Sequence, residues 1–267
     1  MDIPRDNQEW INYIETLKNK LPAVFRRYHR PLPAFVNRAI DHTLLAESAT
    51  NEQVDTLCAE AKSRRFATVC VRPQHVARAA QNLRGCNDIS VACVVSFPDG
   101  TSATADKMNE AQEVIQHGAS ELDMVMNYPQ LKDGRYMEIY HDIAAVRDVA
   151  PDPVKLKVII ETSQLSRDEI IAGSLVAALS GAEFVKTSTG FKGQGATEEN
   201  VQLMRAVADL TDKGTKVKAS GGIRSAEEFV RMLRAGADRI GTSSGVKIME
   251  QLDQGEMMEQ GTGHVVY

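Results

Sequence analysis

Several absences narrow the range of functions open to this chain. No apolar run could cross a bilayer, since even VACVVSF at residues 91–97 is far shorter than a membrane span. The polar start, MDIPRDNQEW, lacks the apolar core of a signal peptide. Basic residues are dispersed and the net charge is −5, which argues against a nucleic-acid footprint. We expect a cytoplasmic protein whose partners are small molecules or copies of itself, with no nucleic acid and no membrane.

Cysteine and histidine are too sparse for a disulfide framework or a metal site. The chain has 4 cysteines and no C-x-x-C pair, so free thiols in a reducing compartment are expected. No two of the 6 histidines have metal-ligand spacing on one helix or hairpin, and we expect no metal. Cys70 and Cys93 lie in apolar runs typical of core packing.

Short β-branched runs alternate with longer helix-like stretches along most of the chain. Strict alternation predicts parallel strands joined by right-handed crossovers. Eight units of this length favour a closed (β/α)8 TIM barrel over a doubly wound open sheet. The expected strands are 37–43, 66–71, 89–97, 119–127, 155–162, 182–188, 215–220 and 238–243, and the expected helices are 51–64, 73–84, 103–117, 134–149, 166–180, 197–212, 224–235 and 244–252.

Two segments lie outside the predicted barrel domain of residues 37–252. Residues 1–36 form an N-terminal helical extension, because NQEWINYIETLKNKL has the pattern of one amphipathic helix followed by a Pro-containing link. This extension either caps the barrel floor or contacts another subunit. Residues 253–267 are Gly-rich and polar until the last three, which predicts a flexible C-terminal tail.

Four ionisable residues stand at the ends of strands that otherwise look apolar: Asp41, Asp123, Lys186 and Lys218. In a barrel, catalytic groups come from the carboxyl ends of the strands. Lys186, in FVKTSTG, either reaches solvent, as strand-end lysines commonly do, or is held in a pocket for use.

The two lysines end neighbouring strands, and side-chain alternation should point both inward. A like charge and partial desolvation each disfavour the protonated amine, so we expect the pKa of both Lys186 and Lys218 to fall toward neutrality. An unprotonated amine is what Schiff-base chemistry needs. Alternatively, Lys218 merely pairs with an acid. Asp123 could supply that partner, accept a proton from a substrate hydroxyl, or do both.

Loops rich in glycine and hydroxyl side chains follow the last three strands. STGFKGQGAT, SGGIRSAEE and GTSSG each precede a helix, an arrangement typical of the phosphate site of a barrel. Glycines let the backbone approach a phosphate closely, and Ser243 and Ser244 add hydroxyl donors. Lys192 either adds a point charge there or is solvated.

Together these segments resemble the deoxyribose-phosphate aldolase family of class I, Schiff-base-forming aldolases. The resemblance covers about residues 37–252 and rests on the linked motifs IDHTLL (40–45), TVCVRP (68–73), VVSFPDG (94–100), ELDMVMN (121–127), FVKTSTGF (184–191), KVKASGGIR (216–224) and GTSSG (241–245). It implies reversible cleavage of 2-deoxy-D-ribose 5-phosphate to D-glyceraldehyde 3-phosphate and acetaldehyde, in deoxyribose phosphate catabolism, without a cofactor.

Matching the motifs residue by residue implies roles for individual side chains. Lys186 becomes the imine-forming residue, Lys218 the second lysine and Asp123 the acid. The implied substrate-binding residues are Asp41, Thr43 and Cys70 in the lower pocket, and Gly190, Gly221, Gly222, Gly241, Ser243 and Ser244 toward the phosphate end. We also expect Thr189 and Lys192 to bind substrate, although the match to the family does not supply these two.

Some features depart from the family pattern or leave alternatives open. The extension at 1–36 is long, and FKGQGAT carries a lysine where many relatives have only small residues. Tyr267 either brings a phenol near the reacting carbon from a folded tail or has no role. Another Schiff-base phosphosugar aldolase or transaldolase, or a catalytically silent phosphosugar-binding regulator, would share the barrel and phosphate loops. A homo-oligomer, with a dimer favoured, is expected.

Overall fold

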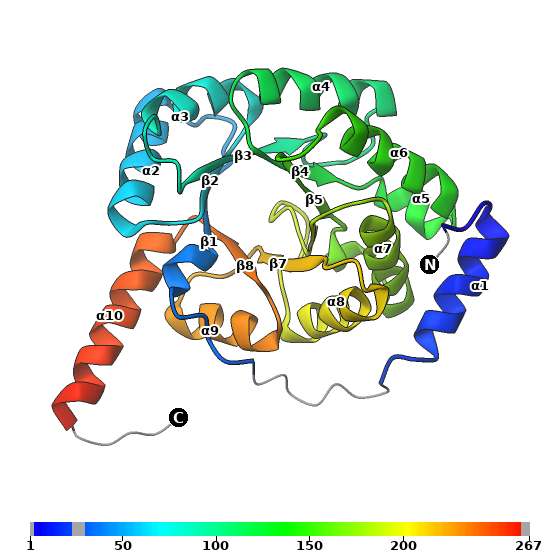
Figure 1. Ribbon diagram of the computed structural model, residues 1–267. Coiled ribbons are helices and arrows are strands. Elements are labelled where there is room, and N and C mark those ends of the chain that lie inside the picture. The colour runs from blue at the N-terminus through cyan, green and yellow to red at the C-terminus, as the bar shows by residue number, and fades with distance from the viewer. Residues whose placement is uncertain (1–2, 23–29, 263–267) are drawn as a thin grey trace.

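Eight parallel strands close into a barrel in chain order in the computed structural model, which describes residues 3–22 and 30–262 (Figure 1). The predicted (β/α)8 architecture is confirmed, and every expected strand overlaps an observed one. The strands are β1 (Ile40–Leu44), β2 (Thr68–Val71), β3 (Ser90–Val95), β4 (Glu121–Val125), β5 (Lys155–Ile159), β6 (Phe184–Lys186), β7 (Lys216–Ser220) and β8 (Arg239–Thr242).

Helices surround the barrel between successive strands (Figure 1). Several begin where the sequence supplies a capping box: Thr50, Ser166 and Ser225 each accept a hydrogen bond from the amide of the third helical residue. The α-helices are α1 (Asn7–Lys18), α2 (Asn51–Arg64), α3 (Val76–Asn82), α4 (Thr104–Gln116), α5 (Tyr128–Lys132), α6 (Tyr136–Val149), α7 (Arg167–Leu179), α8 (Glu198–Thr211), α9 (Ala226–Ala235) and α10 (Gly245–Thr262), and the short 3₁₀ helices are η1 (Val36–Ala39), η2 (Pro73–His75) and η3 (Thr162–Gln164).

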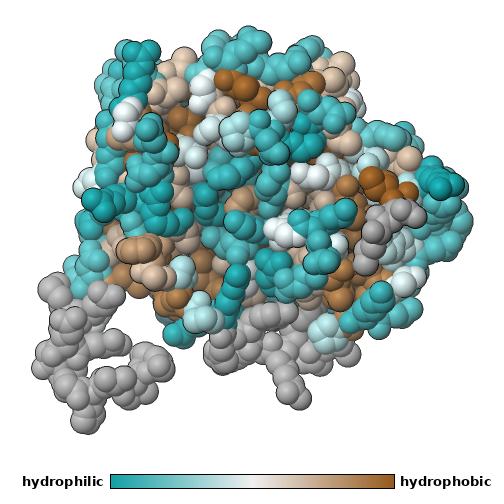
Figure 2. Space-filling view, in the orientation of Figure 1, coloured by the Kyte–Doolittle hydropathy of each residue, from teal (hydrophilic) through white to brown (hydrophobic). Residues whose placement is uncertain are grey.

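Side-chain alternation along the strands divides the core into two parts. Outward residues such as Leu156 and Val158 of β5 join the large apolar layer between strands and helices. Inside the barrel, the apolar cluster consists only of Leu45, Cys70, Ala92 and Val94, with Phe97 packed on it. Charged side chains therefore fill much of the remaining interior, as described below. On the face in Figure 2, hydrophilic residues surround scattered apolar patches.

The N-terminal helix α1 packs on the outside of the barrel, beside α6 and α7, and not across its floor (Figure 1). Its buried side chains are Trp10, Ile14 and Leu17, and the Trp10 ring lies 5.8 Å from that of Tyr140. At the other end of α1, Lys18 forms an ion pair with Asp168 at 2.6 Å. The extension is thus docked to its own chain through an apolar stripe.

The C-terminal helix α10 runs to Thr262, so the predicted domain boundary at residue 252 falls inside a helix. Tyr267 lies outside the described residues. Within residues 3–22 and 30–262, none of the helices combines the length and the apolar character needed to cross a membrane. The same part of the chain contains no cluster of three or more His, Cys, Asp or Glu side chains that could hold a metal ion.

Candidate active site

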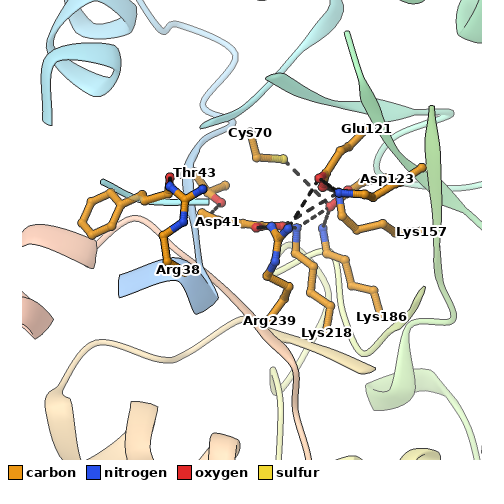
Figure 3. A network of polar contacts seen from close by, with 12 residues as sticks. Arg38, Asp41, Thr43, Cys70, Glu121, Asp123, Lys157, Lys186, Lys218 and Arg239 are labelled. Atoms are coloured by element: carbon orange, nitrogen blue, oxygen red, sulfur yellow. Dashed lines mark hydrogen bonds and ion pairs between the residues drawn. The ribbon is translucent and has the colours of Figure 1, made fainter. Parts of the chain in front are cut away.

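Strand register places the two predicted lysines side by side. Lys186 of β6 is directly opposite Lys218 of β7 in the sheet. Their ammonium groups contact the same oxygen, Oδ2 of Asp123, at 2.6 and 2.7 Å respectively (Figure 3). All three side chains are buried, with at most 3% of Lys186 exposed. The predicted convergence of both lysines with Asp123 is confirmed. The predicted strand-end position is right only for Lys186, because Asp41, Asp123 and Lys218 lie within β1, β4 and β7 and so deeper in the barrel.

The strands are less apolar than the sequence suggested, because three further charged side chains point into the barrel. Lys157 of β5 contacts Asp123 Oδ1 at 2.7 Å and Glu121 Oε2 at 2.8 Å. Arg239 of β8 binds both Asp41 and Glu121. Alternation along KLK at 155–157 was the signal that could have placed Lys157 on the inner face.

These groups form one connected set, which we call the ion network (Figure 3). Its ion pairs link three carboxylates to four buried or largely buried cations; the members are Asp41, Glu121, Asp123, Lys157, Lys186, Lys218 and Arg239. Lys155 also contacts Glu121, but 45% of its side chain is exposed, so water screens its charge. The buried charges balance when one of the four cations loses its proton.

Lys186 is the lysine of this network whose pKa is lowered. Burial is the main cause, and the positive charge of Lys218 acts in the same direction; together they outweigh the opposite effect of Asp123. Lys186 is therefore easier to deprotonate than an ordinary lysine, which is the direction predicted from the sequence.

For Lys218 the predicted fall in pKa is wrong. Burial lowers its pKa, but Asp123 and Asp41 more than offset this, and the net shift is upward. The Lys218 ammonium lies 2.5 Å from Asp41 Oδ2, a second carboxylate that the sequence argument did not bring to it. Lys218 consequently stays charged and acts on Lys186 as a fixed cation.

Asp123 and Lys157 are held in their charged forms. Burial alone would raise the pKa of Asp123, but Lys157, Lys186 and Lys218 bring it well below the ordinary value. Burial would likewise lower the pKa of Lys157, but Asp123, Glu121 and Asp41 raise it above the ordinary value. At neutral pH Asp123 is thus a carboxylate, able to accept a proton but holding none to give.

A pocket of about 420 Å³ opens above Lys186 at the carboxyl ends of the strands. This volume falls in the range of small-molecule sites. Seven of the predicted substrate-binding residues line it, namely Thr43, Thr189, Gly190, Gly221, Gly222, Gly241 and Ser243, together with Leu44, Leu45, Ala46, Phe191, Ser220, Ile223, Arg224 and Thr242. The exposed cation Arg224 was not singled out from the sequence.

The glycine-rich end of the pocket offers unused backbone donors. Within the described residues, the N–H groups of Gly190, Gly221 and Gly222 donate no hydrogen bond. Gly221 has φ +87°, and a Cβ there would lie 2.9 Å from the Cα of Gly195, so the two loops meet backbone to backbone. Unpaired N–H groups beside a cation form a typical anion site.

The other predicted substrate-binding residues lie outside the lining of this pocket. Asp41 is fully buried in the ion network, and the Cys70 thiol lies 3.9 Å from Asp123 Oδ2. The amide of Ser244 donates to Thr242 at the start of α10. Lys192 forms an ion pair with Asp99 at 2.6 Å and a hydrogen bond with the Tyr128 hydroxyl at 2.8 Å, so its ammonium group is directed to neighbouring loops.

Replacing Lys157 with methionine should destabilise the fold by about 3–5 kcal/mol, because a buried carboxylate pair would lose its shared cation. The matched control is Lys155→Met, which removes a 45% exposed lysine bound to the same Glu121 and should cost less than about 1 kcal/mol. Urea unfolding of both variants measures the difference. Equal losses would mean that the buried network is not the source of the stability.

Comparisons with known proteins give a consistent result. The model of the DeoC/LacD family of aldolases matches residues 35–251. A Coccidioides immitis (strain RS) protein named deoxyribose-phosphate aldolase is 53% identical over 248 residues, covering 92% of each chain. A crystal structure of a candidate deoxyribose-phosphate aldolase from Coccidioides immitis has a TM-score of 0.90 at 52% identity, covering 93% of this chain and 98% of that one. The tetrameric deoxyribose phosphate aldolase of Aeropyrum pernix has a TM-score of 0.75 at 32% identity, with 82% and 91% covered.

Proposed function

The chain belongs to the DeoC/LacD family of aldolases, and on this premise we propose that it reversibly cleaves 2-deoxy-D-ribose 5-phosphate to D-glyceraldehyde 3-phosphate and acetaldehyde. The observation that carries the proposal is a buried lysine of lowered pKa at the base of a pocket with an anion-binding end. Such an amine can attack an aldehyde at neutral pH.

The first half of the proposed reaction is imine formation. The neutral Nζ of Lys186 attacks C1 of the open-chain sugar phosphate, and the carbinolamine loses water to give an iminium ion. The amides of Gly190, Gly221 and Gly222, with Arg224, would hold the phosphate at the other end of the pocket. This places the reacting carbon and the phosphate at opposite ends of one cavity.

The second half breaks the carbon–carbon bond. Asp123, with Lys218 and a water molecule, accepts the proton of the C3 hydroxyl; neither side chain lines the pocket, so the water molecule carries the proton between the substrate and Asp123. The C2–C3 electron pair moves to the iminium nitrogen, and glyceraldehyde 3-phosphate leaves. The enamine then takes a proton at C2, and hydrolysis of the imine releases acetaldehyde and regenerates Lys186.

Substrate choice distinguishes this proposal from the other Schiff-base aldolases. The purified protein should cleave 2-deoxyribose 5-phosphate in a coupled assay for glyceraldehyde 3-phosphate and should leave fructose phosphates uncleaved. Preference for a fructose phosphate would indicate another aldolase or a transaldolase. Binding of the sugar phosphate without turnover would instead favour a silent regulator.

The pH dependence of imine formation tests the role assigned to Lys218. The amine is inactive while protonated, so the rate should rise as pH increases through the pKa of Lys186. The charge of Lys218 helps to lower that pKa, so Lys218→Met should move the rise to higher pH. The measurement is the rate of borohydride-trapped adduct with acetaldehyde across neutral and alkaline pH. The control is Lys216→Met, which removes an exposed lysine from the same strand; an identical profile in both variants would refute the role.

The oligomeric state and the cellular location of the protein are predictions from the sequence. We propose a homo-oligomer, with a dimer favoured; the tetramer described for the Aeropyrum pernix relative supports assembly into an oligomer. Light scattering on the purified protein tests it, and a monomer at all concentrations would contradict it. The cytoplasmic location and the involvement of Tyr267 stay predictions; deleting Tyr267 and measuring solvent-proton exchange into acetaldehyde tests the latter.

A further inference from the structure

Glu161, just beyond β5, is a buried carboxyl group that the reaction described above does not use. Its side chain is fully buried, and its backbone has φ +57°, in the left-handed region. Residues other than glycine rarely adopt this conformation, and they persist there where the surrounding structure holds them. Such residues cluster at functional sites, so the contacts of Glu161 are informative.

The contacts of Glu161 lead directly to the phosphate end of the pocket. Both the hydroxyl and the amide of Thr189 donate to Glu161 Oε2, at 2.5 and 3.2 Å. The amide of Phe191 in turn donates to the Thr189 hydroxyl at 3.1 Å. A hydrogen-bond chain thus runs from Phe191 through Thr189 to Glu161 and spans the intervening Gly190.

Gly190 lies between Thr189 and Phe191, the two loop residues that these hydrogen bonds connect. It lines the pocket with φ +85°, and its own N–H donates no hydrogen bond among the described residues. Glycine is the most permissive residue, so the direction of this N–H depends on how firmly its two neighbours are held. Both neighbours are held by Glu161, Thr189 directly and Phe191 through the Thr189 hydroxyl.

We propose that Glu161 is a positioning residue that fixes the turn at 189–191 so that the Gly190 amide points at the phosphate of the substrate. This inference rests on the proposed function and adds to it the source of the preference for a phosphorylated sugar. Glu161 is not among the residues that line the pocket. It acts through Thr189, whose hydroxyl group is already hydrogen-bonded to Glu161 and to the Phe191 amide and therefore stabilises the turn at 189–191.

The second carboxylate oxygen of Glu161 makes it possible to test the positioning of Thr189 separately from the negative charge of Glu161. Oε1 is buried and has no hydrogen-bond partner among the described residues. In Glu161→Gln the amide oxygen can take the place of Oε2 and still accept from Thr189, while the amide nitrogen takes the unpartnered place. Glu161→Asp keeps the carboxylate but is one methylene shorter and does not reach Thr189.

The test compares kinetics on 2-deoxyribose 5-phosphate and on unphosphorylated 2-deoxyribose. Glu161→Ala and Thr189→Val should each raise KM for the phosphorylated sugar about 10- to 100-fold, the scale of a lost charge-assisted hydrogen bond. Activity on the unphosphorylated sugar should change far less. The loss in the double variant should be smaller than the sum of the two single losses, because both variants remove the bond from the Thr189 hydroxyl to Glu161. Glu161→Gln should recover most of the loss, and Glu161→Asp should not.

Equal losses on the two sugars would overturn the inference, since the effect would then be structural. The inference would also fail if Glu161→Asp restored the KM for the phosphorylated sugar and Glu161→Gln did not. The negative charge of Glu161, and not its hydrogen bonds to Thr189, would then be the cause. If Glu161→Ala does not fold, Thr189→Val, which keeps the side-chain shape, supplies the same comparison. A wild-type protein that cleaves neither sugar and traps no imine would instead refute the proposed function, and this inference with it.

Discussion

Lys186→Ala is expected to abolish turnover of 2-deoxyribose 5-phosphate, with a loss of about 10⁵-fold or more, the scale seen when a covalent nucleophile is removed. It should also abolish the borohydride-stabilised adduct with acetaldehyde, because no other lysine of the ion network has a lowered pKa. Peptide mass mapping of the wild-type adduct should find the added mass on the peptide that contains residue 186.

The ion network predicts that this variant folds well. With Lys186 removed, three carboxylates remain with three cations, so the buried charges stay balanced. Lys186→Ala should therefore lose far less stability than Lys157→Met, which leaves Asp123 and Glu121 without their shared cation. Urea unfolding of the two variants distinguishes a dead but folded enzyme from an unfolded one. An adduct that survives in Lys186→Ala would refute the assignment of the nucleophile.

Asp123→Asn should lower kcat by about 10²- to 10⁴-fold, the range typical of a lost general acid–base group. The variant should nevertheless still form a trapped adduct with acetaldehyde. The carboxylate of Asp123 raises the pKa of Lys186, so removing its charge favours the neutral amine even more. Imine formation and carbon–carbon cleavage should thus separate in this one variant, with slow cleavage and retained trapping.

The matched control for Asp123→Asn is Glu121→Gln. Glu121 lies two residues earlier on the same strand and shares Lys157 with Asp123, but it contacts neither Lys186 nor Lys218 in the described structure. Glu121→Gln should lose stability for the same electrostatic reason and should keep most of its kcat. If both variants lose turnover equally, the loss comes from the charge of the network and not from proton transfer by Asp123.

Measuring imine formation and carbon–carbon cleavage separately also tests whether the carboxylate of Asp123 raises the pKa of Lys186. Should Asp123→Asn lose both trapping and turnover, Asp123 would be required for imine formation itself. Thermal unfolding of each variant should be measured beside these assays, since Asp123→Asn leaves two carboxylates for Lys157, Lys218 and Arg239, one buried cation more than they balance.

Much of the fold and part of the site could be predicted from the sequence because the signals are local. Period-two alternation in FVK and KVK places Lys186 and Lys218 on one face of their strands, and parallel neighbours bring equivalent positions into register. Capping residues such as Ser166 and Ser225 mark helix starts within a few residues of the chain. Neither inference needs a contact between distant segments.

Other features could not be predicted because they depend on such contacts. The upward pKa shift of Lys218 requires Asp41 of β1, a carboxylate from the opposite end of the barrel sequence, at 2.5 Å. The direction of Lys192 depends on Asp99, in the loop after β3, and on Tyr128, at the start of α5. The link from Glu161 to Thr189 depends on a left-handed residue that no local pattern marks.

The sequence by itself determined the barrel, the inward direction of both lysines and the Gly-rich loops, because strand periodicity, helix periodicity and turn residues are local features of neighbouring positions. Only the tertiary structure decided which of the two lysines has the lowered pKa. That outcome depends on the distances between charges from different strands and on their removal from water, and both are set when the barrel closes.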